Sequence, residues 1–112
     1  RIYFNQVLIM PLAQDQKKRF RQIGHNLKPV VMIADKGLTE NVLAELERAI
    51  EDHELIKVKL AVLDKENKQA LITAICDESG AELVQAIGKI ALIYRAAKKP
   101  NPKLSNILRN QV

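Results

Sequence analysis

The stretch PVVMIADKGLTENVL, residues 29–43, decides the fold. Its apolar run stops at Asp35-Lys36-Gly37, and a pattern typical of an amphipathic helix follows at once. A continuous apolar run of this length is typical of a strand buried on both faces of a sheet. Thr39 is a good cap for the helix. The stretch therefore predicts a strand-to-helix corner that carries a lysine and a glycine.

Length and composition narrow the class of protein. The 112 residues suffice for one domain, which buries about two-thirds of the surface that its unfolded chain exposes. No apolar run reaches the roughly 18 residues that span a bilayer. The single cysteine, Cys76, falls on the apolar face of a predicted helix and is interpreted as a packed thiol in a reducing compartment. We therefore expect a cytoplasmic monomer without a membrane anchor, in which residues 1–11 form an N-terminal tail.

Charge is distributed unevenly along the chain. The net charge is +5 over residues 1–39, −5 over 40–54, −1 over 55–82 and +6 over 83–112. Both ends are basic, and an acidic segment lies between them. Such segregation favours a surface with one side that faces a polyanion.

The segment before the corner is predicted to be a basic helix. Asp15 is placed to cap residues 16–27, in which Phe20, Ile23 and Leu27 recur at the spacing of a buried stripe. Four basic residues fall within about 80° of the helix circumference and form a ridge. They are Lys17, Arg21, His25 and Lys28.

The rest of the chain is expected to form a helix, a strand, a third helix and a hairpin. The strand LIKVKLAVL, residues 55–63, alternates apolar residues with Lys57 and Lys59. Asp64 and Gly80 suit the start and the exit of the third helix. The second helix turns its acidic side chains outward. They are Glu40, Glu45, Glu47 and Glu51.

The order of these elements predicts a fold class. Gly88-Lys89 joins the last two strands, with glycine first as a type II′ turn prefers. The order α-β-α-β-α-β-β predicts a compact α/β domain with a four-stranded mixed sheet. Each strand-helix-strand unit should give parallel neighbours, while the hairpin adds an antiparallel edge. KKPNPK, residues 98–103, reads as an extended basic tail, not a packed element.

The corner is a candidate site for an anion. The first backbone N–H groups of a helix lack partners within it, and the helix dipole adds partial positive charge there. Gly37 permits positive φ and the close approach of a ligand, and Lys36 supplies a compact cation for phosphate. A purely structural turn is the alternative interpretation.

Catalytic motifs are missing from the sequence. It holds no C-x-x-C, H-E-x-x-H, G-x-S-x-G or phosphate-binding G-x-x-x-x-G-K-[ST] pattern. His25 and His53 are the only imidazoles, and each falls at the polar end of a predicted helix. We therefore expect no enzyme, no cofactor and no metal site.

Two blocks of the sequence resemble a known family. HNLKPVVMIADKGLTENVLAELERAIEDHELIKVKL, residues 25–60, and AELVQAIGKIALIYR, residues 81–95, are similar to the CRM domain (chloroplast RNA splicing and ribosome maturation) in its bacterial stand-alone form, the YhbY-type RNA-binding protein. The resemblance covers residues 12–98, and we take 99–112 as a basic C-terminal tail. It implies an RNA-binding α/β fold, similar to the C-terminal domain of a bacterial translation initiation factor. The implied partner is ribosomal RNA in precursors of the large (50S) ribosomal subunit.

The resemblance also implies a binding loop. The family's G-x-x-G loop, analogous to the backbone-clamping loop of KH domains, falls at Ala34-Asp35-Lys36-Gly37. If the first position requires positive φ, Ala34 strains the loop by roughly 1 to 2 kcal/mol. This loop, the ridge and further basic residues give the candidate RNA-binding residues. They are Lys17, Arg21, His25, Lys28, Ala34, Asp35, Lys36, Gly37, Thr39, Lys57, Lys59 and Arg95.

Simpler interpretations and other functions stay open. Lysines that alternate along a strand usually form a solvated face, Arg95 could pair with a carboxylate, and Tyr94 could pack on the sheet instead of stacking on a base. A small enzyme could use His53 with a nearby acid. An adaptor could dock a basic ribosomal protein on the acidic side of the second helix. That side would present Glu40, Glu47, Glu51 and Glu54.

Overall fold

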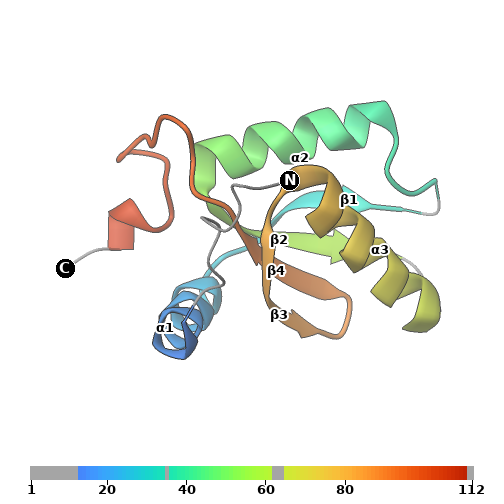
Figure 1. Cartoon of the computed structure of the whole chain (residues 1–112), viewed down its shortest axis with the longest axis horizontal. Coiled ribbons are helices and arrows are strands. Elements are labelled where there is room, and N and C mark those ends of the chain that lie inside the picture. The colour runs from blue at the N-terminus through green and yellow to red at the C-terminus, as the bar shows by residue number, and fades with distance from the viewer. Residues whose placement is uncertain (1–12, 35, 62–64, 111–112) are drawn as a thin grey trace.

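A four-stranded mixed sheet organises the protein, with helices on both of its faces (Figure 1). The computed structural model describes residues 13–34, 36–61 and 65–110. In chain order the elements are α1 (Gln14–Gly24), β1 (Pro29–Ile33), α2 (Glu40–His53), β2 (Leu55–Leu60), α3 (Lys65–Ser79), β3 (Glu82–Ile87), β4 (Ile90–Tyr94) and the short 3₁₀ helix η2 (Leu108–Asn110). The predicted α/β class, element order and mixed sheet are confirmed.

The strands lie in the order β1-β2-β4-β3. β1 pairs with β2 in parallel, as predicted, and β4 is antiparallel to both β2 and β3. The prediction of parallel neighbours is wrong for β2 and β3, because β4 inserts between them. The hairpin therefore supplies a central strand, β4, as well as the edge strand β3.

The main core lies between the sheet and the two helices α2 and α3. Because successive side chains of a strand point to opposite faces, every second residue of β1, β2 and β4 enters this core. The buried strand residues of this cluster are Val31, Ile33, Ile56, Val58, Leu60, Ala91 and Ile93. From the helices, Leu46 and Ile50 of α2 and Ile72 and Ile75 of α3 close it.

A second, smaller core lies under α1, on the opposite face of the sheet. Its buried members are Phe20, Leu55, Val84, Leu92 and Ile107. The predicted stripe of α1 is confirmed, because Ile23 and Leu27 pack against this cluster beside the buried ring of Phe20. α1 covers only part of its face.

The strand β1 differs from the prediction. It is an edge strand and pairs only with β2, so it is not buried on both faces. Val31 and Ile33 point into the main core, whereas Val30 and Met32 point outward and are 49% and 59% exposed. A continuous apolar run thus encodes one buried face and one exposed apolar face.

The ends of α1 also differ from the prediction. The helix begins at Gln14, and Ala13 occupies the N-cap, so Asp15 lies in the first turn and does not cap the helix. The helix ends at Gly24, which is buried, and a Cβ there would lie 2.6 Å from Cδ2 of Leu92. Glycine therefore lets the last turn of α1 approach the sheet closely. Lys28 lies beyond the helix, which shortens the predicted ridge.

The structure confirms the predicted helix cap and the predicted glycine turns. Thr39 is the N-cap of α2, and its Oγ1 accepts a hydrogen bond from Val42 N at 3.2 Å. Gly80, after α3, has φ of 74°, as a left-handed exit requires. In the hairpin only Gly88 has positive φ, at 57°, which fits the first position of a type II′ turn. The predicted cap Asp64 lies outside the described residues.

The segment after β4 is part of the fold. The sequence suggested a tail, but Ser105 is fully buried and Ile107 enters the core under α1. Two further contacts tie the segment to the turn between α2 and β2. His53 Nδ1 donates to Leu104 O at 2.9 Å, and Asn106 Nδ2 donates to Leu55 O at 2.7 Å. Residues 98–103 are exposed, but the chain beyond them is packed.

Glu54 holds this segment from inside. It follows α2 with φ of 63°, a conformation that is unfavourable for a residue with a side chain. Its carboxylate accepts hydrogen bonds from Ser105 Oγ at 2.6 Å and from Ala97 N at 2.7 Å. Since Glu54 is only 5% exposed, it is a structural residue and not part of an acidic docking surface.

Candidate nucleic-acid interface

The corner between β1 and α2 is a tight turn. Gly37 N donates to Ala34 O at 2.9 Å, and Thr39 N donates to Gly37 O at 3.1 Å. The cap hydrogen bond from Val42 to Thr39 uses one of the first N–H groups of α2. The N–H groups of Glu40 and Asn41 have no partner among the described residues. The corner therefore offers backbone donors at the positive end of the α2 dipole.

The positive φ at position 37 requires glycine, and the space around Gly37 is open. Its φ is 71°, and a Cβ at this position would meet no atom within 4 Å. Ala34 has no positive φ, so the strain predicted for alanine at the first loop position does not arise. Ala34 is exposed and Gly37 is half-buried, so both can be reached by a ligand at this corner. Asp35 lies outside the described residues.

A shallow groove of about 380 Å³ lies at this corner. We call it the corner groove. Lys36, which is exposed, provides its only charged lining group in the described part of the chain. Its lining residues are Met32, Ala34, Lys36, Gly37, Thr39 and Val42.

The predicted basic ridge on α1 is only partly available. Lys17 Nζ lies 3.7 Å from Glu82 Oε2, so its charge is paired with β3. Arg21 and His25 line a groove between α1 and the hairpin. Lys28 is exposed at the start of β1. Two of the four ridge residues thus meet at one cavity, while the other two lie apart from it.

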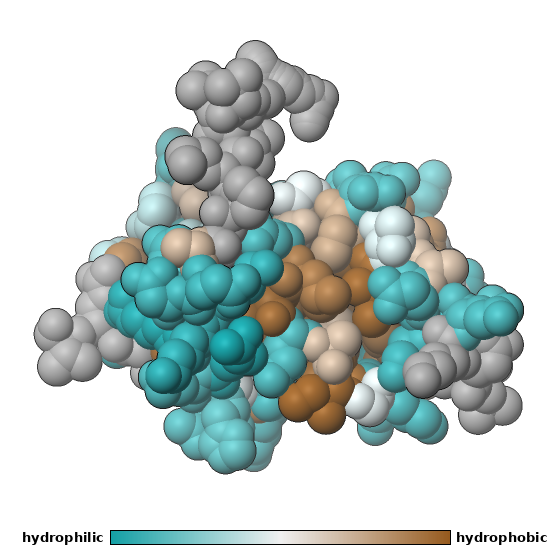
Figure 2. Space-filling model, turned by 60° about the horizontal axis from the view of Figure 1, so that its bottom comes forward, coloured by the Kyte–Doolittle hydropathy of each residue, from teal (hydrophilic) through white to brown (hydrophobic). Residues whose placement is uncertain are grey.

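A part of the sheet that α1 leaves uncovered connects this groove with the corner. We call it the open face, defined by Val30, Met32, Lys57, Lys59, Ile87 and Ile90. Lys59 lies in register with Met32 of β1, and Lys57 lines the groove beside α1. Figure 2 shows apolar surface gathered in the middle of this side of the molecule, with hydrophilic surface on either side. Exposed apolar patches bordered by polar groups mark interaction sites.

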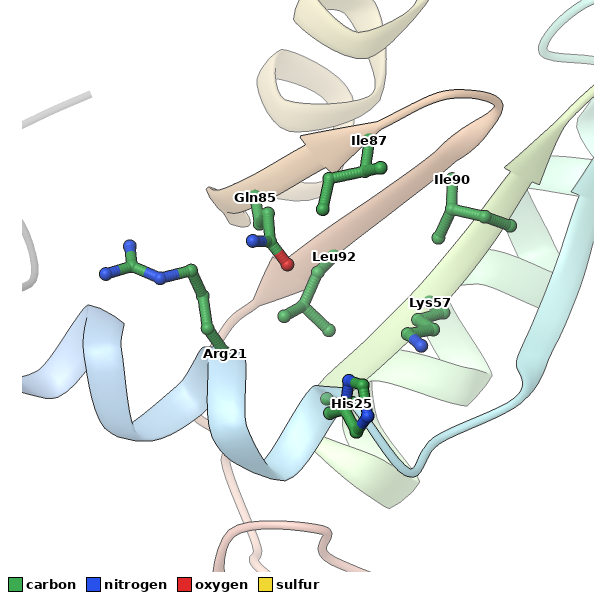
Figure 3. Close-up of a pocket in the computed structure, with 8 residues that line it drawn as sticks. Arg21, His25, Lys57, Gln85, Ile87, Ile90 and Leu92 are labelled. Carbon is green, nitrogen blue, oxygen red and sulfur yellow. The ribbon is translucent and has the colours of Figure 1, made fainter.

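The groove between α1 and the sheet has a volume of about 290 Å³, and we call it the α1 groove. Figure 3 shows Gln85, Leu92 and Lys57 projecting from the sheet toward α1, while Arg21 extends outward from the helix. No carboxylate is among its lining residues in the described part of the chain. They are Arg21, Gly24, His25, Lys57, Gln85, Ile87, Ile90 and Leu92.

Arg95 is already engaged within the fold. Its guanidinium forms an ion pair with Glu47, lies 3.3 Å from Glu51 Oε1, and donates to Ser79 O at 2.9 Å. The hydrogen bond with Glu47 raises the pKa of Arg95, and the same bond lowers the pKa of Glu47. Backbone N–H groups of Lys99 and Lys98 lower the pKa of Glu51. These contacts favour the structural interpretation of Arg95.

These contacts also bear on the adaptor hypothesis. Of the four acidic side chains that would form a docking surface, Glu54 is buried, and Glu47 and Glu51 bind Arg95. Only Glu40 has no contact of this kind in the described part of the chain. One acid of the proposed docking surface is therefore buried and two are engaged by Arg95, although the Glu47 side chain stays 58% exposed.

Other candidate residues have structural partners. The ring of Tyr94 packs against Phe20 with 4.7 Å between the ring centroids, and burial raises its pKa. His53 Nδ1 donates to the carbonyl oxygen of Leu104, which gives this imidazole a structural role in holding the segment after β4. Burial raises the pKa of the Cys76 thiol, as expected of a packed thiol.

The described residues show neither a candidate metal-binding cluster nor a candidate membrane-spanning helix. Among residues 13–34, 36–61 and 65–110, His, Cys, Asp and Glu side chains do not gather in threes as they would around a metal ion. No helix in the same part of the chain is both long enough and apolar enough to cross a membrane.

The sequence did not reveal the hairpin's part in the site. Gln85, Ile87, Ile90 and Leu92 line the α1 groove, yet none of them was a candidate. A single residue pattern could not have found them, because the groove exists only where β4 lies beside β2 and α1 crosses the sheet. The sequence signals that pointed to it were the basic residues at helical spacing on α1 and the alternating lysine Lys57.

Comparison with known proteins adds independent findings. The family model for the CRS1/YhbY (CRM) domain matches residues 12–95. A probable RNA-binding protein of Pseudomonas aeruginosa is 59% identical over 100 residues, which cover 89% of this chain and 96% of that protein. An RNA-binding protein of Haemophilus influenzae is 47% identical over 93 residues, covering 83% of this chain and 94% of that protein.

A solved structure shows the same fold. It is the solution structure of a Staphylococcus aureus protein described as a candidate RNA-binding protein. The TM-score is 0.70 at 32% sequence identity, and the match covers 80% of this chain and 93% of that one.

Proposed function

Because the chain belongs to the CRS1/YhbY (CRM) domain family, we propose that it binds RNA along one continuous surface. This surface begins at the α1 groove, crosses the open face and ends at the corner groove. The relatives described as RNA-binding proteins support the class of ligand. The two grooves and the open face between them support the position of this surface.

One observation carries the proposal. The two grooves are joined by outward-facing side chains of β1 and β2, since Lys57 lines the α1 groove and Met32, the register partner of Lys59, lines the corner groove. Five cations along this path make no ion pair in the described part of the chain. They are Arg21, Lys28, Lys36, Lys57 and Lys59. Unpaired cations beside free backbone N–H groups are suited to a phosphate backbone.

Backbone recognition is favoured over a base-by-base code. The chain has only four aromatic residues, and of these Phe20 and Tyr94 pack against each other. Within residues 13–34, 36–61 and 65–110, stacking of several successive bases therefore lacks a platform. Affinity would come mainly from phosphate contacts, which release counterions and depend strongly on salt.

Salt dependence tests this surface. If the five cations each neutralise one phosphate of a single-stranded RNA, the slope of log K against log salt is about −3.5. The double variant Lys36→Glu/Arg21→Glu should weaken binding and reduce the magnitude of the slope by about 1.4. The matched control is Lys103→Glu/Arg109→Glu, which makes the same charge change at exposed residues outside both grooves. Equal affinities and slopes for the two double variants would remove this surface from the proposal.

The target RNA is a finer part of the proposal. The family resemblance implies ribosomal RNA in precursors of the large ribosomal subunit, and we propose that target here. Crosslinking of the protein to RNA in growing cells, followed by mapping of the crosslinked nucleotides, tests it directly. Crosslinks spread over messenger RNA, with none enriched in large-subunit RNA, would contradict it while leaving RNA binding in place.

A further inference from the structure

The α1 groove has the composition of a site for a single nucleobase. Its apolar side consists of Leu92, which is buried, and of Ile90 and Ile87 toward the end of the hairpin. Its polar side consists of two groups with planar ends, Arg21 of α1 and His25, the C-cap of that helix. Unpaired bases in RNA complexes stack on imidazole rings and on guanidinium planes. Phosphate-only recognition would not require the apolar side.

A bulge in β3 gives the groove its amide. The register of β3 against β4 shifts between Leu83 and Gln85, so Val84 is an extra residue in the strand. Val84 enters the core under α1, and Gln85 lies on the same side and lines the groove. Without the shift, strict alternation would turn Gln85 to the opposite face. The bulge thus aims a hydrogen-bonding amide into an otherwise apolar and cationic cavity.

Gly24 sets how closely α1 approaches the sheet beside the groove. Gly24 brings the last turn of the helix against Leu92, where any side chain at this position would collide with it. The chain then leaves the helix and turns to β1, which leaves the end of the hairpin uncovered. Ile87 is 64% exposed there, although it is a large apolar residue.

We propose that the α1 groove holds one unpaired nucleotide of the bound RNA. The base lies between the planar groups of Arg21 and His25 and the apolar floor at Leu92, and the Gln85 amide hydrogen-bonds to its edge. Lys57 contacts the adjoining phosphate. This inference rests on the proposed function and adds a structural preference to it, because a base inside a continuous duplex cannot enter the groove.

The choice of an RNA nucleotide over a free metabolite follows from the neighbouring surface. The groove is continuous with the open face, where Lys59 and the exposed side chain of Met32 lead toward the corner. An RNA backbone bound along these cations would bring a base to the groove while that base is still part of the RNA chain. A free nucleotide would use the groove alone and gain none of the remaining phosphate contacts.

Two hairpin RNAs of the same stem sequence test the inference. One carries a single unpaired 2-aminopurine, and in the other the same 2-aminopurine is paired within the stem. The wild-type protein should bind the first RNA at least about tenfold more tightly, because a flipped base costs least where it is already unpaired. The fluorescence of the unpaired 2-aminopurine should change on binding, because the base leaves the RNA stack and enters the groove.

Variants locate the effect. Gln85→Leu keeps the size of the side chain but removes the amide, so the preference for the unpaired base should fall roughly fivefold, the effect of one hydrogen bond. Gln69→Leu is the matched control, because Gln69 is an exposed glutamine of α3 that lines neither groove. Ile87→Ser provides a second variant at an exposed position, where folding should not be at risk. It should also reduce the preference for the unpaired base, because Ile87 lines the apolar side of the groove.

The outcomes separate the inference from the proposed function. If both RNAs bind equally and the fluorescence stays unchanged in the complex, the nucleotide site is wrong, while RNA binding stands. If Gln85→Leu and Gln69→Leu keep the same preference, the base is held elsewhere. If neither RNA binds at low salt, both proposals fail together.

Discussion

The two faces of the sheet come from alternate residues of the same strands, yet they differ in purpose. In β2, Ile56, Val58 and Leu60 are buried under α2 and α3, while Lys57 and Lys59 lie on the other face. Two helices bury the first face along β2. The single helix α1 closes only part of the second, and the uncovered part keeps lysines beside exposed apolar side chains. Incomplete covering therefore separates a surface able to bind a ligand from a face that only stabilises the fold.

Neighbouring residues of β1 give the largest expected contrast between these faces. Ile33 is fully buried on the covered face, so Ile33→Ala should lower the free energy of unfolding by about 2–5 kcal/mol. Met32 is 59% exposed on the open face, so Met32→Ala should change it by no more than about 0.5 kcal/mol. Urea denaturation of both variants measures the difference. Equal losses would show that a partner or another part of the chain covers the open face.

A smaller effect is expected where α1 meets the sheet. Gly24→Ala places a methyl group 2.6 Å from Leu92 Cδ2, and Leu92 is only 2% exposed and has little room to move. Overpacking of about 1–3 kcal/mol exceeds the gain of about 0.5–1 kcal/mol from alanine in a helix. We expect a net loss of about 1–2 kcal/mol in urea denaturation.

The same variant reports on the α1 groove. Since the added methyl group pushes α1 away from Leu92, Gly24→Ala should also weaken binding of the RNA with the unpaired base. A variant as stable as the wild type would mean that α1 already moves freely on its face. That result would contradict a preformed groove.

The smallest effect is expected at the edge of the covered face, where Arg95 binds Glu47 and Glu51 of α2. The pKa of each carboxyl is lowered in the fold, so both contribute stability above their ordinary pKa of about 4.5, and this stability is lost as pH falls through the lower folded pKa values. The Glu47–Arg95 pair is worth about 1 kcal/mol or less, because the Glu47 side chain is 58% exposed.

Urea midpoints between pH 3 and pH 7 measure this acid dependence. Arg95→Met should make the decline below about pH 4.5 less steep, since Glu47 loses the hydrogen bond that lowers its pKa most. The pKa of Glu51 should change less, because backbone N–H groups of Lys99 and Lys98 lower it more than Arg95 does. Arg48→Met is the control, because Arg48 is an exposed arginine of α2, the helix that carries Glu47 and Glu51. An identical pH profile for Arg95→Met and the wild type would show that Arg95 does not stabilise this edge.

Much of the fold was predictable because its signals are local. The Thr39 cap, the glycine turns and the alternation in β2 depend on residues a few positions apart, and the structure confirms each of them. The helix spacing of Arg21 and His25 also placed them correctly on one side of α1. Such periodicity is fixed by backbone geometry before any tertiary contact forms.

The missed features depend on distant contacts. Glu54 reads as one more acid of an acidic helix, but Ser105, 51 residues later, makes it a buried anchor. The Pro-rich appearance of residues 98–103 concealed a packed segment beyond them. Likewise, the four hairpin residues of the α1 groove became part of a site only through the bulge in β3 and the insertion of β4.

The sequence by itself determined the order of the elements, the turn at Gly37 with its cationic neighbour, and the likeness to the CRM domain. Tertiary structure alone decided which strand lies at the edge, which acids pair with Arg95 or Ser105, and which part of the sheet stays uncovered. The physical reason is the range of the interactions. Caps, turns and periodicity act over a few residues, whereas strand order and helix docking depend on the packing of segments that are far apart in the chain.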